Sequence, residues 1–292
     1  MQVLIDGTYY DKEHAKISVF DHGLLYGDGI FEGIRIYNGR VFELEDHIER
    51  LYMSAQAIAL EVPIDRVAMF EATLETVRRN ELRDGYIRLV VTRGEGDLGL
   101  NPVKCPKSSY FIITSTIQLY PPEAYEKGLT VITCSTRRNS PQCINGSVKS
   151  LNYLTNILGA LELRGTGANE GIVLNQDGWV AECTADNLFF VKGGKVFTPH
   201  PITGALRGIS RGVVIKLCRE QLSIPVEEGL YTLYDIYNAD ELFLTGTGAE
   251  AAPIVEADRR KIGDGTPGPV TRRIIKAFRD YAATSGAPVW PE

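Results

Sequence analysis

Short apolar runs separated by turn residues dominate the first 45 positions, a pattern that predicts β-hairpins. The clearest turn is Asn38-Gly39, which separates the runs 34–37 and 40–42. Asn-Gly favours the tight turns that join antiparallel strands. Beyond these hairpins we expect two helices and then two strands, at 45–60, 65–80, 86–92 and 110–117. This part of the chain therefore predicts an α+β unit.

Each of these two helices has apolar residues three and four positions apart, which gives it one apolar face. In the first helix we expect burial of Ile48, Leu51, Ala55 and Ile58. In the second we expect burial of Val67, Phe70, Leu74 and Val77.

The later part of the chain is richer in strands. A strand is expected at 129–135, and hairpins are expected at 171–182 and 187–198. Ser210 is expected to cap one helix and Pro269 to begin the last one. At 292 residues the chain is long for one hydrophobic core. With Pro121-Pro122 as a linker signal, we predict a small domain, a linker and a large domain, at 1–117, 118–128 and 129–292.

A helix is also expected after Lys149, because Leu151, Leu154, Leu158 and Leu161 recur at helical spacing before Gly165. Lys149 would then lie at the positive end of the helix dipole, where its charged form is disfavoured, and burial would lower its pKa further. A neutral amine attacks carbonyls, and lysines form Schiff bases in this way. A surface lysine beside a helix is the alternative, so partners elsewhere must decide.

Composition narrows the class of protein. The chain is 44% hydrophobic and 23% charged, with a net charge of −6, which is ordinary for a globular protein and argues against a nucleic-acid surface. No long apolar run occurs, so we expect a cytoplasmic protein without a membrane segment. Five scattered cysteines and four histidines lack disulfide or metal-ligand spacing, so free, buried thiols and no metal site are expected.

Other candidates could serve a pyridoxal phosphate cofactor, which needs a lysine, an anion for its ring nitrogen, a phosphate site and a group near its ring hydroxyl. Tyr153 follows Lys149 by four residues and would share its helical face. Glu182 stands between two apolar strands, where a buried carboxylate needs a cation. An exposed strand-end glutamate and a core tyrosine are the alternatives.

Two segments could bind phosphate. Residues 206–210 lead into a helix, whose first N–H groups bind anions, although an ordinary capped helix has the same sequence. The turn at 245–250 is rich in small residues and N–H groups and could take a phosphate or a substrate carboxylate. A dinucleotide site is disfavoured, because neither Gly27-Asp28-Gly29 nor Gly165-Thr166-Gly167 completes the required glycine pattern.

Several motifs, in order and over nearly the whole chain, resemble those of the fold-type IV (class IV) aminotransferases, and most of all the branched-chain amino-acid aminotransferases. They are residues 21–35 with Phe31-Glu32-Gly33-Ile34-Arg35, Arg50-Leu51, Tyr86-Ile87-Arg88, Lys149-Ser150-Leu151-Asn152-Tyr153, Glu182, Asn187-Leu188-Phe189, Gly208-Ile209-Ser210 and Gly246-Thr247. The resemblance implies a two-domain fold of mixed α+β and α/β character like that of D-amino-acid aminotransferase. It comprises a small α+β domain and a larger strand-rich domain with flanking helices.

The resemblance also implies residue roles. Lys149 would bond covalently to pyridoxal phosphate, Glu182 would hold its ring nitrogen and Tyr153 its hydroxyl. Further cofactor contacts would come from Arg50, Asn187, Leu206, Gly208, Ile209, Ser210, Gly246 and Thr247. Substrate contacts would come from Phe31, Gly33, Arg35, Tyr86, Arg88, Thr247, Gly248 and Ala249, and from Tyr26 and Leu100, which a neighbouring subunit would lend in a homodimer or larger assembly.

The implied reaction moves an amino group from L-leucine, L-isoleucine or L-valine to 2-oxoglutarate by a ping-pong route. A D-amino-acid aminotransferase and an aminodeoxychorismate lyase share the lysine and glutamate and are the alternatives within the fold. A non-catalytic protein that binds pyridoxal phosphate or a metabolite is the alternative from another class. Arg207 and the segment Asn145-Gly146-Ser147 depart from the family pattern and leave the substrate open.

Overall fold

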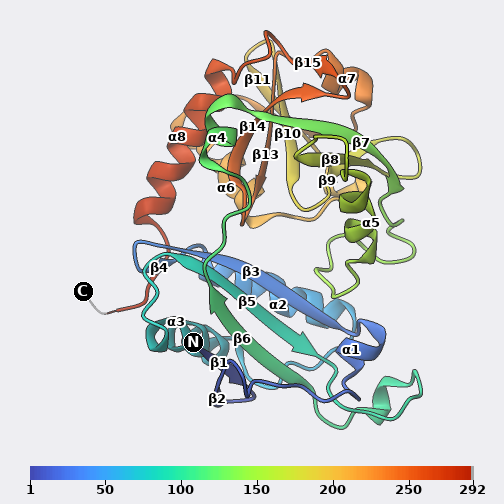
Figure 1. Cartoon of the computed structure of the whole chain (residues 1–292), viewed down its shortest axis with the longest axis vertical. Helices are drawn as coiled ribbons and strands as arrows, with labels where there is room; N and C mark the ends of the chain where they lie inside the picture. The colour runs from blue at the N-terminus through green and yellow to red at the C-terminus, as the bar shows by residue number, and fades with distance from the viewer. Residues whose placement is uncertain (291–292) are drawn as a thin grey trace. The chain divides into compact units, whose positions relative to one another are not determined.

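The computed structural model describes residues 1–290, which form two compact units (Figure 1). Unit 1 comprises residues 1–117, 148–152 and 282–290, and unit 2 comprises 118–147 and 153–281. These units differ from the predicted domains by placing 148–152 and 282–290 with the first part of the chain. The domain division itself stays a prediction, and positions 291 and 292 of the expected large domain lie outside the described residues.

Unit 1 contains a seven-stranded sheet in the order β16-β4-β3-β5-β6-β1-β2. Its strands are β1 (Gln2–Ile5), β2 (Thr8–Asp11), β3 (Gly29–Tyr37), β4 (Arg40–Val41), β5 (Gly85–Thr92), β6 (Ser109–Ser115) and β16 (Ala287–Pro288). The predicted hairpin is confirmed, with Tyr37 opposite Arg40. Asn38 and Gly39 both have positive φ, at 51° and 75°, which the tightest hairpin turns require at both central residues.

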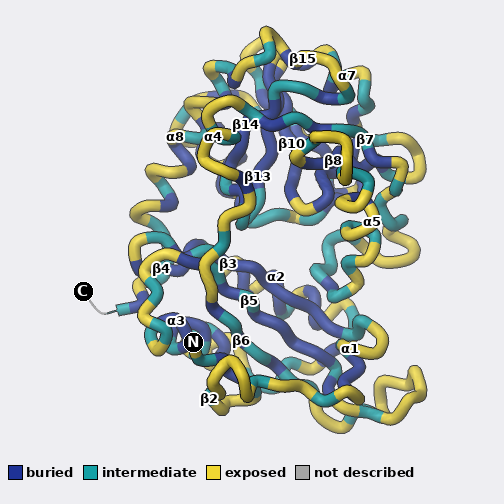
Figure 2. The backbone as a smooth tube through the Cα atoms, in the orientation of Figure 1, coloured by how far each residue is buried: buried dark blue, intermediate teal, exposed yellow. Residues whose placement is uncertain are grey.

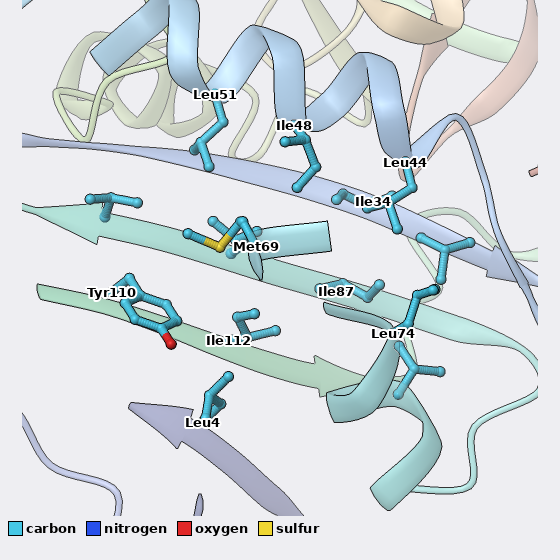
Figure 3. Packing of buried hydrophobic residues seen from close by; sticks show 14 of the residues in the cluster. Leu4, Ile34, Leu44, Ile48, Leu51, Met69, Leu74, Ile87, Tyr110 and Ile112 are labelled. Carbon is cyan, nitrogen blue, oxygen red and sulfur yellow. The ribbon is translucent and has the colours of Figure 1, made fainter. Parts of the chain in front are cut away.

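The helices of unit 1 are α1 (His22–Tyr26), α2 (Leu44–Ala57) and α3 (Arg66–Arg79), with a single 3₁₀ turn at Pro102–Lys104. Both long predicted helices are confirmed within a few residues. Figure 3 shows how α2 and α3 supply apolar side chains to the sheet. Leu44, Ile48 and Leu51 of α2 belong to one buried cluster with Ile34 and Ile87.

The predicted inward face of α3 is wrong at its start. Val67 is 73% exposed, whereas Met69 is fully buried. The buried side includes Thr73 and Thr76, whose hydroxyls donate to the carbonyls of Met69 and Ala72 at 2.7 Å. These hydrogen bonds satisfy the hydroxyls locally and let threonine occupy inward positions. A pattern of apolar residues alone therefore placed the face incorrectly.

Unit 2 contains a nine-stranded mixed sheet in the order β12-β11-β10-β13-β14-β7-β8-β9, with β15 paired to β14. Its strands are β7 (Leu129–Arg137), β8 (Glu170–Leu174), β9 (Val180–Cys183), β10 (Asn187–Lys192), β11 (Lys195–Pro199), β12 (Val226–Gly229), β13 (Glu241–Gly246), β14 (Glu250–Ala257) and β15 (Arg260–Lys261). Both predicted hairpins are confirmed, since β8 pairs with β9 and β10 with β11.

The helices of unit 2 include α4 (Pro122–Lys127), α5 (Leu154–Glu162), α6 (Ile209–Lys216), α7 (Leu233–Tyr237) and α8 (Pro269–Thr284). A 3₁₀ turn at Pro201–Thr203 and a π-helical turn at Leu217–Gln221 complete them. Pro269 begins α8 as predicted. The expected linker instead contains α4, which contacts β14.

Burial follows the sheets and the helix faces that pack on them (Figure 2). Helix α5 differs, because Leu154, Ile157, Leu158 and Leu161 are 47–66% exposed. All five cysteines are free, but Cys143 is exposed and Cys105 half-buried, so the expectation that all are buried is wrong. Within residues 1–290, none of the helices combines the length and apolar character needed to cross a membrane.

Candidate functional site

Lys149 lies in an extended segment of unit 1 rather than at the start of a helix. Its carbonyl accepts a hydrogen bond from Phe31 N–H at 3.0 Å, and Leu151 N–H donates to Gly29 O at 2.9 Å. Helix α5 begins only at Leu154. The prediction of a helix dipole at Lys149, and of Tyr153 on the same helical face, is therefore wrong. Pairing with the distant strand β3 holds these residues extended, and local periodicity does not reveal it.

The Lys149 amine lies close to residues that the sequence predicted as substrate contacts. Its Nζ is 4.4 Å from the centroid of the Phe31 ring, and the guanidinium carbon of Arg88 is 4.6 Å from the same centroid. Arg88 also donates to the Tyr86 hydroxyl at 3.1 Å. Such distances suit cation–π contacts. Unit 1 therefore brings together the primary amine of Lys149, the ring of Phe31 and the guanidinium of Arg88.

Gly33 makes room for Tyr86 in this group. A Cβ at position 33 would lie 2.0 Å from the Tyr86 hydroxyl oxygen, which is shorter than any contact that real Cβ atoms make. Arg35, also predicted as a substrate contact, instead donates to Ile117 O at 3.3 Å and lies 5.1 Å from the centroid of the Tyr37 ring. Its substrate role stays a prediction.

Arg50, the predicted phosphate contact of unit 1, is held by Glu32. Its Nε and Nη2 donate to the two Glu32 carboxylate oxygens at 2.8 and 2.7 Å. His47 Nδ1 lies 2.7 Å from Glu32 Oε2. Neither Glu32 nor His47 was among the predicted site residues, although the spacing of His47 and Arg50 places them on one side of a helix.

Glu182 lies on β9 and is buried, so the alternative of an exposed strand-end glutamate is wrong. Arg138 Nη2 is 2.6 Å from its Oε1. Its Oε2 accepts from Leu206 N–H at 2.8 Å and from Asn187 Nδ2 at 3.1 Å. Three donor groups of unit 2, one of them a cation, thus bond this buried carboxylate. Sequence reasoning missed Arg138, because it follows β7 without any motif around it.

Asn187 joins Glu182 to both predicted phosphate-binding segments. Its Nδ2 also donates to Leu206 O at 3.0 Å, just before α6. Asn187 pairs with Thr245 at the end of β13, next to the turn 246–249. A Cβ at Gly208 would lie 2.0 Å from Asn187 Oδ1, so that glycine permits the close approach. The carboxylate, the start of α6 and the turn therefore share one end of the sheet.

The start of α6 differs from its prediction, because its N-cap is Gly208 rather than Ser210. Ser210 is the second helical residue and is buried. Among the described residues no side chain caps the first-turn N–H groups, which leaves them suited to an anion. In the nearby turn, Thr247 and Gly248 are half-buried, whereas Ala249 is fully buried in the core. Ala249 could therefore contact a ligand through its backbone but not through its side chain.

The remaining predicted site residues are Leu100, Tyr26 and Tyr153. Leu100 is 77% exposed, and Tyr26 is 38% exposed, with its hydroxyl donating to Leu98 O at 2.6 Å. Tyr153 immediately precedes α5. Their predicted roles stay predictions.

Each unit has groups that fit pyridoxal phosphate. Unit 1 supplies a primary amine and a guanidinium. Unit 2 supplies a buried carboxylate for a protonated ring nitrogen and uncapped helical N–H groups for a phosphate. These groups would meet three of the four needs of such a cofactor, which are the lysine, the anion for its ring nitrogen and the phosphate site.

The sequence matches the family described as class IV amino-transferase over residues 29–257. It is 47% identical to a putative branched-chain-amino-acid aminotransferase of Methanocaldococcus jannaschii over 292 residues, which is 100% of both chains. The fold is similar to that of the branched-chain amino acid aminotransferase of Escherichia coli, with a TM-score of 0.94, 35% identity and coverage of 99% of this chain and 97% of that one. A branched-chain amino acid aminotransferase from T.th., complexed with N-(5'-phosphopyridoxyl)-L-glutamate, gives a TM-score of 0.91 at 34% identity, covering 97% and 94%.

Proposed function

Because the chain belongs to the class IV aminotransferases, a fold-type IV family that uses pyridoxal phosphate, we propose that it is a branched-chain amino-acid aminotransferase. It moves the amino group of L-leucine, L-isoleucine or L-valine to 2-oxoglutarate in a ping-pong reaction. The observation that carries this proposal is the Phe31 ring, which contacts both Lys149 and Arg88. It offers an apolar side chain a surface beside the reacting amine, and Arg88 offers the second carboxylate of 2-oxoglutarate a cation.

Lys149 is the catalytic residue of this proposal. When bound, pyridoxal phosphate withdraws electrons from the substrate α-carbon through its ring. Lys149 Nζ would take the proton from that carbon as a general base and, as the resulting general acid, pass it to C4′ of the cofactor; in the second half-reaction it would move a proton from C4′ back to the α-carbon. Phe31 beside the amine excludes water from it and supplies no competing proton acceptor.

The cofactor contacts are those that the family resemblance implies. Glu182 accepts a hydrogen bond from the protonated ring nitrogen, and Asn187 keeps the carboxylate in place. Leu206 packs on the ring, and Tyr153 bonds the ring hydroxyl. The phosphate is bound by Arg50, Gly208, Ile209, Ser210, Gly246 and Thr247. Uncapped N–H groups at the start of α6 support this assignment.

The substrate contacts that the resemblance implies serve the two carboxylates of glutamate and the apolar side chain of the branched-chain amino acid. Tyr86 and the backbone of Thr247, Gly248 and Ala249 receive the α-carboxylate, while Arg88 receives the second carboxylate of glutamate. Phe31 and Gly33 shape the apolar pocket, and Arg35 is a further substrate contact.

We also propose a homodimer in which the second copy lends Tyr26 and Leu100 to the pocket. Leu98, Leu100 and Val103 are 68–83% exposed in one loop of unit 1. A second copy would cover this apolar surface, and exposed apolar patches of this kind mark protein interfaces. Five free cysteines suit a reducing compartment, and we place the enzyme in the cytoplasm.

A substrate panel with purified protein tests the assignment. We expect loss of the cofactor's absorbance band on adding L-leucine, L-isoleucine or L-valine without an acceptor, and recovery on adding 2-oxoglutarate. Faster turnover of D-alanine than of L-leucine would assign the chain to a D-amino-acid enzyme. A visible cofactor band with no released 2-oxo acid would assign it to a binding protein.

A further inference from the structure

We propose that Glu32 and His47 are positioning residues that fix the guanidinium plane of Arg50 for the cofactor phosphate. The inference rests on the phosphate-binding role proposed for Arg50. It assigns a task to two buried polar residues that the reaction does not itself use.

The geometry of the pair defines the orientation of Arg50. Its Nε and Nη2 bond the two oxygens of Glu32 at 2.8 and 2.7 Å, a two-point contact that fixes the plane of the guanidinium as well as its position. The planar group carries its donors on two edges, and the edge that includes Nη1 faces away from Glu32. Two bonds to one carboxylate thus determine where the other edge points.

His47 fixes the carboxylate in turn. Its Nδ1 is 2.7 Å from Glu32 Oε2, and it precedes Arg50 by three residues on α2, so both bond Glu32 from one side of the helix. Burial lowers the pKa of His47, and the charges of Arg50 and Lys149 act in the same direction against the opposing effect of Glu32. A neutral imidazole that donates from Nδ1 leaves a lone pair on Nε2. No residue among positions 1–290 bonds that buried nitrogen.

The charge balance of the cluster agrees with this task. Burial by itself raises the pKa of Glu32, but the charge of Arg50 and the hydrogen bonds from Arg50 and His47 outweigh it and lower that pKa to about 2. Glu32 is therefore ionised and Arg50 is charged. The Glu32 side chain is 1% exposed, whereas that of Arg50 is 11% exposed. Arg50 is therefore the more accessible member of this ion pair.

The cluster lies on the opposite face of β3 from the proposed substrate contacts Phe31 and Gly33. Glu32 lies on β3 between Phe31 and Gly33, and successive side chains of a strand point to opposite faces. Ile30 and Ile34, on the face of Glu32, belong to the buried core with Leu51 of α2. A charged cluster in an apolar layer is unfavourable for stability compared with apolar residues of similar size. Its presence there calls for a function other than packing.

The test measures how much the phosphate contributes to cofactor binding. Apoprotein is titrated with pyridoxal phosphate and with pyridoxal, which lacks the phosphate. The Kd of pyridoxal divided by the Kd of pyridoxal phosphate is then compared between variants. We expect Glu32→Gln to lower this ratio about tenfold or more and His47→Gln to lower it by about threefold, because a loosened guanidinium loses its charged hydrogen bonds to the phosphate. The ³¹P resonance of the bound cofactor should shift toward that of free pyridoxal phosphate in both variants.

Two further variants make the outcome decisive. Asp28→Asn is the matched control, since Arg93 bonds Asp28 through Nε and Nη2 at 2.9 and 3.0 Å in the same unit; it should leave the ratio unchanged. Arg50→Met should lower the ratio at least as much as Glu32→Gln. An unchanged ratio in Arg50→Met would overturn its phosphate role and this inference together. A lowered ratio there, with His47→Gln and any folded Glu32→Gln protein at the wild-type value, would overturn the positioning role alone.

Discussion

Arg138 Nη2 lies 2.6 Å from Oε1 of Glu182, and the two side chains are 13% and 6% exposed. The pair gives the buried carboxylate of unit 2 a cation from the chain itself. A protonated ring nitrogen would bring a second cation to the same carboxylate. The stability of the protein should therefore depend on Arg138 most strongly when the cofactor is absent.

Replacing Arg138 by methionine tests this dependence. Removing one partner of a buried ion pair destabilises a protein by about 3–5 kcal/mol, and we expect a loss of this order in the apoprotein. In the holoprotein the ring nitrogen replaces part of the missing charge, so the loss should be smaller. Thermal melts of both forms measure the difference. Equal losses in the two forms would show that no cation other than Arg138 reaches Glu182.

Lys149→Ala should abolish transamination while leaving the melting temperature of the apoprotein nearly unchanged. The backbone bonds of Lys149 to Phe31 and Ser54 do not involve its amine, so the segment keeps its place. Borohydride treatment of the wild-type holoenzyme and peptide mapping should find the cofactor attached to Lys149. A label on another lysine would contradict the assignment of the catalytic residue.

Gly33→Ala should impair substrate binding more than cofactor binding. The added methyl group would meet the Tyr86 hydroxyl at 2.0 Å and displace it. We expect KM for leucine to rise about tenfold, which corresponds to about 1.4 kcal/mol, with little change in the Kd of pyridoxal phosphate.

Gly212→Ala is the matched control, because a Cβ there would meet nothing within 4 Å. Alanine is favoured over glycine within a helix by up to about 1 kcal/mol, so this variant should be as active as the wild type and slightly more stable. A wild-type KM in Gly33→Ala would mean that Tyr86 does not contact the substrate.

Acid should weaken the fold through Glu32. Its pKa falls from an ordinary value of 4.5 to about 2 in the folded protein, so its stabilising effect is present above pH 4.5 and is lost as the pH falls toward 2. A shift of this size corresponds to about 3 kcal/mol. His47, whose pKa is lowered from 6.5, adds a loss that begins as the pH falls through its unfolded value.

Denaturant titrations at a series of pH values compare the wild type with Glu32→Gln. The wild type should lose stability steeply between pH 4.5 and 2, and the variant should lack the part that Glu32 contributes. Parallel curves for the two proteins would contradict the lowered pKa of Glu32.

Two inactive variants should restore activity when they share a dimer. One carries Lys149→Ala, and the other carries Tyr26→Ala with Leu100→Asp. If Tyr26 and Leu100 are lent to the neighbouring copy, a mixed dimer has one site with wild-type Lys149, Tyr26 and Leu100. Co-expression with two affinity tags, followed by purification through both, isolates that dimer. Activity no greater than that of the two variants alone would show that each copy uses its own Tyr26 and Leu100.

Sequence patterns predicted those parts of the fold that depend on neighbours in the chain. The hairpin at Asn38-Gly39 requires two positive φ values, and Asn-Gly supplies both. The hairpin of β8 and β9 was equally local. Motif resemblance indicated Lys149 and Glu182, because it compares whole constellations of residues.

Features that depend on distant partners could not be predicted in this way. Lys149 is extended because β3, more than a hundred positions earlier, pairs with its segment, and the apolar spacing after it favoured a helix that starts too early. Arg138 and Glu182 are far apart in the sequence and are brought together by the fold of unit 2. The inward face of α3 was missed for a different reason, because its threonines are polar by type but satisfy their hydroxyls on carbonyls of the same helix.

The main chain around Lys149 is tied to β3 on both sides, through Phe31 and Gly29. In the proposed reaction the Lys149 amine leaves the cofactor and bonds to it again in every cycle. Because the backbone on both sides of Lys149 is fixed, this movement is confined to the four methylene groups of the side chain. The amine would therefore return to the cofactor from a backbone position that does not change.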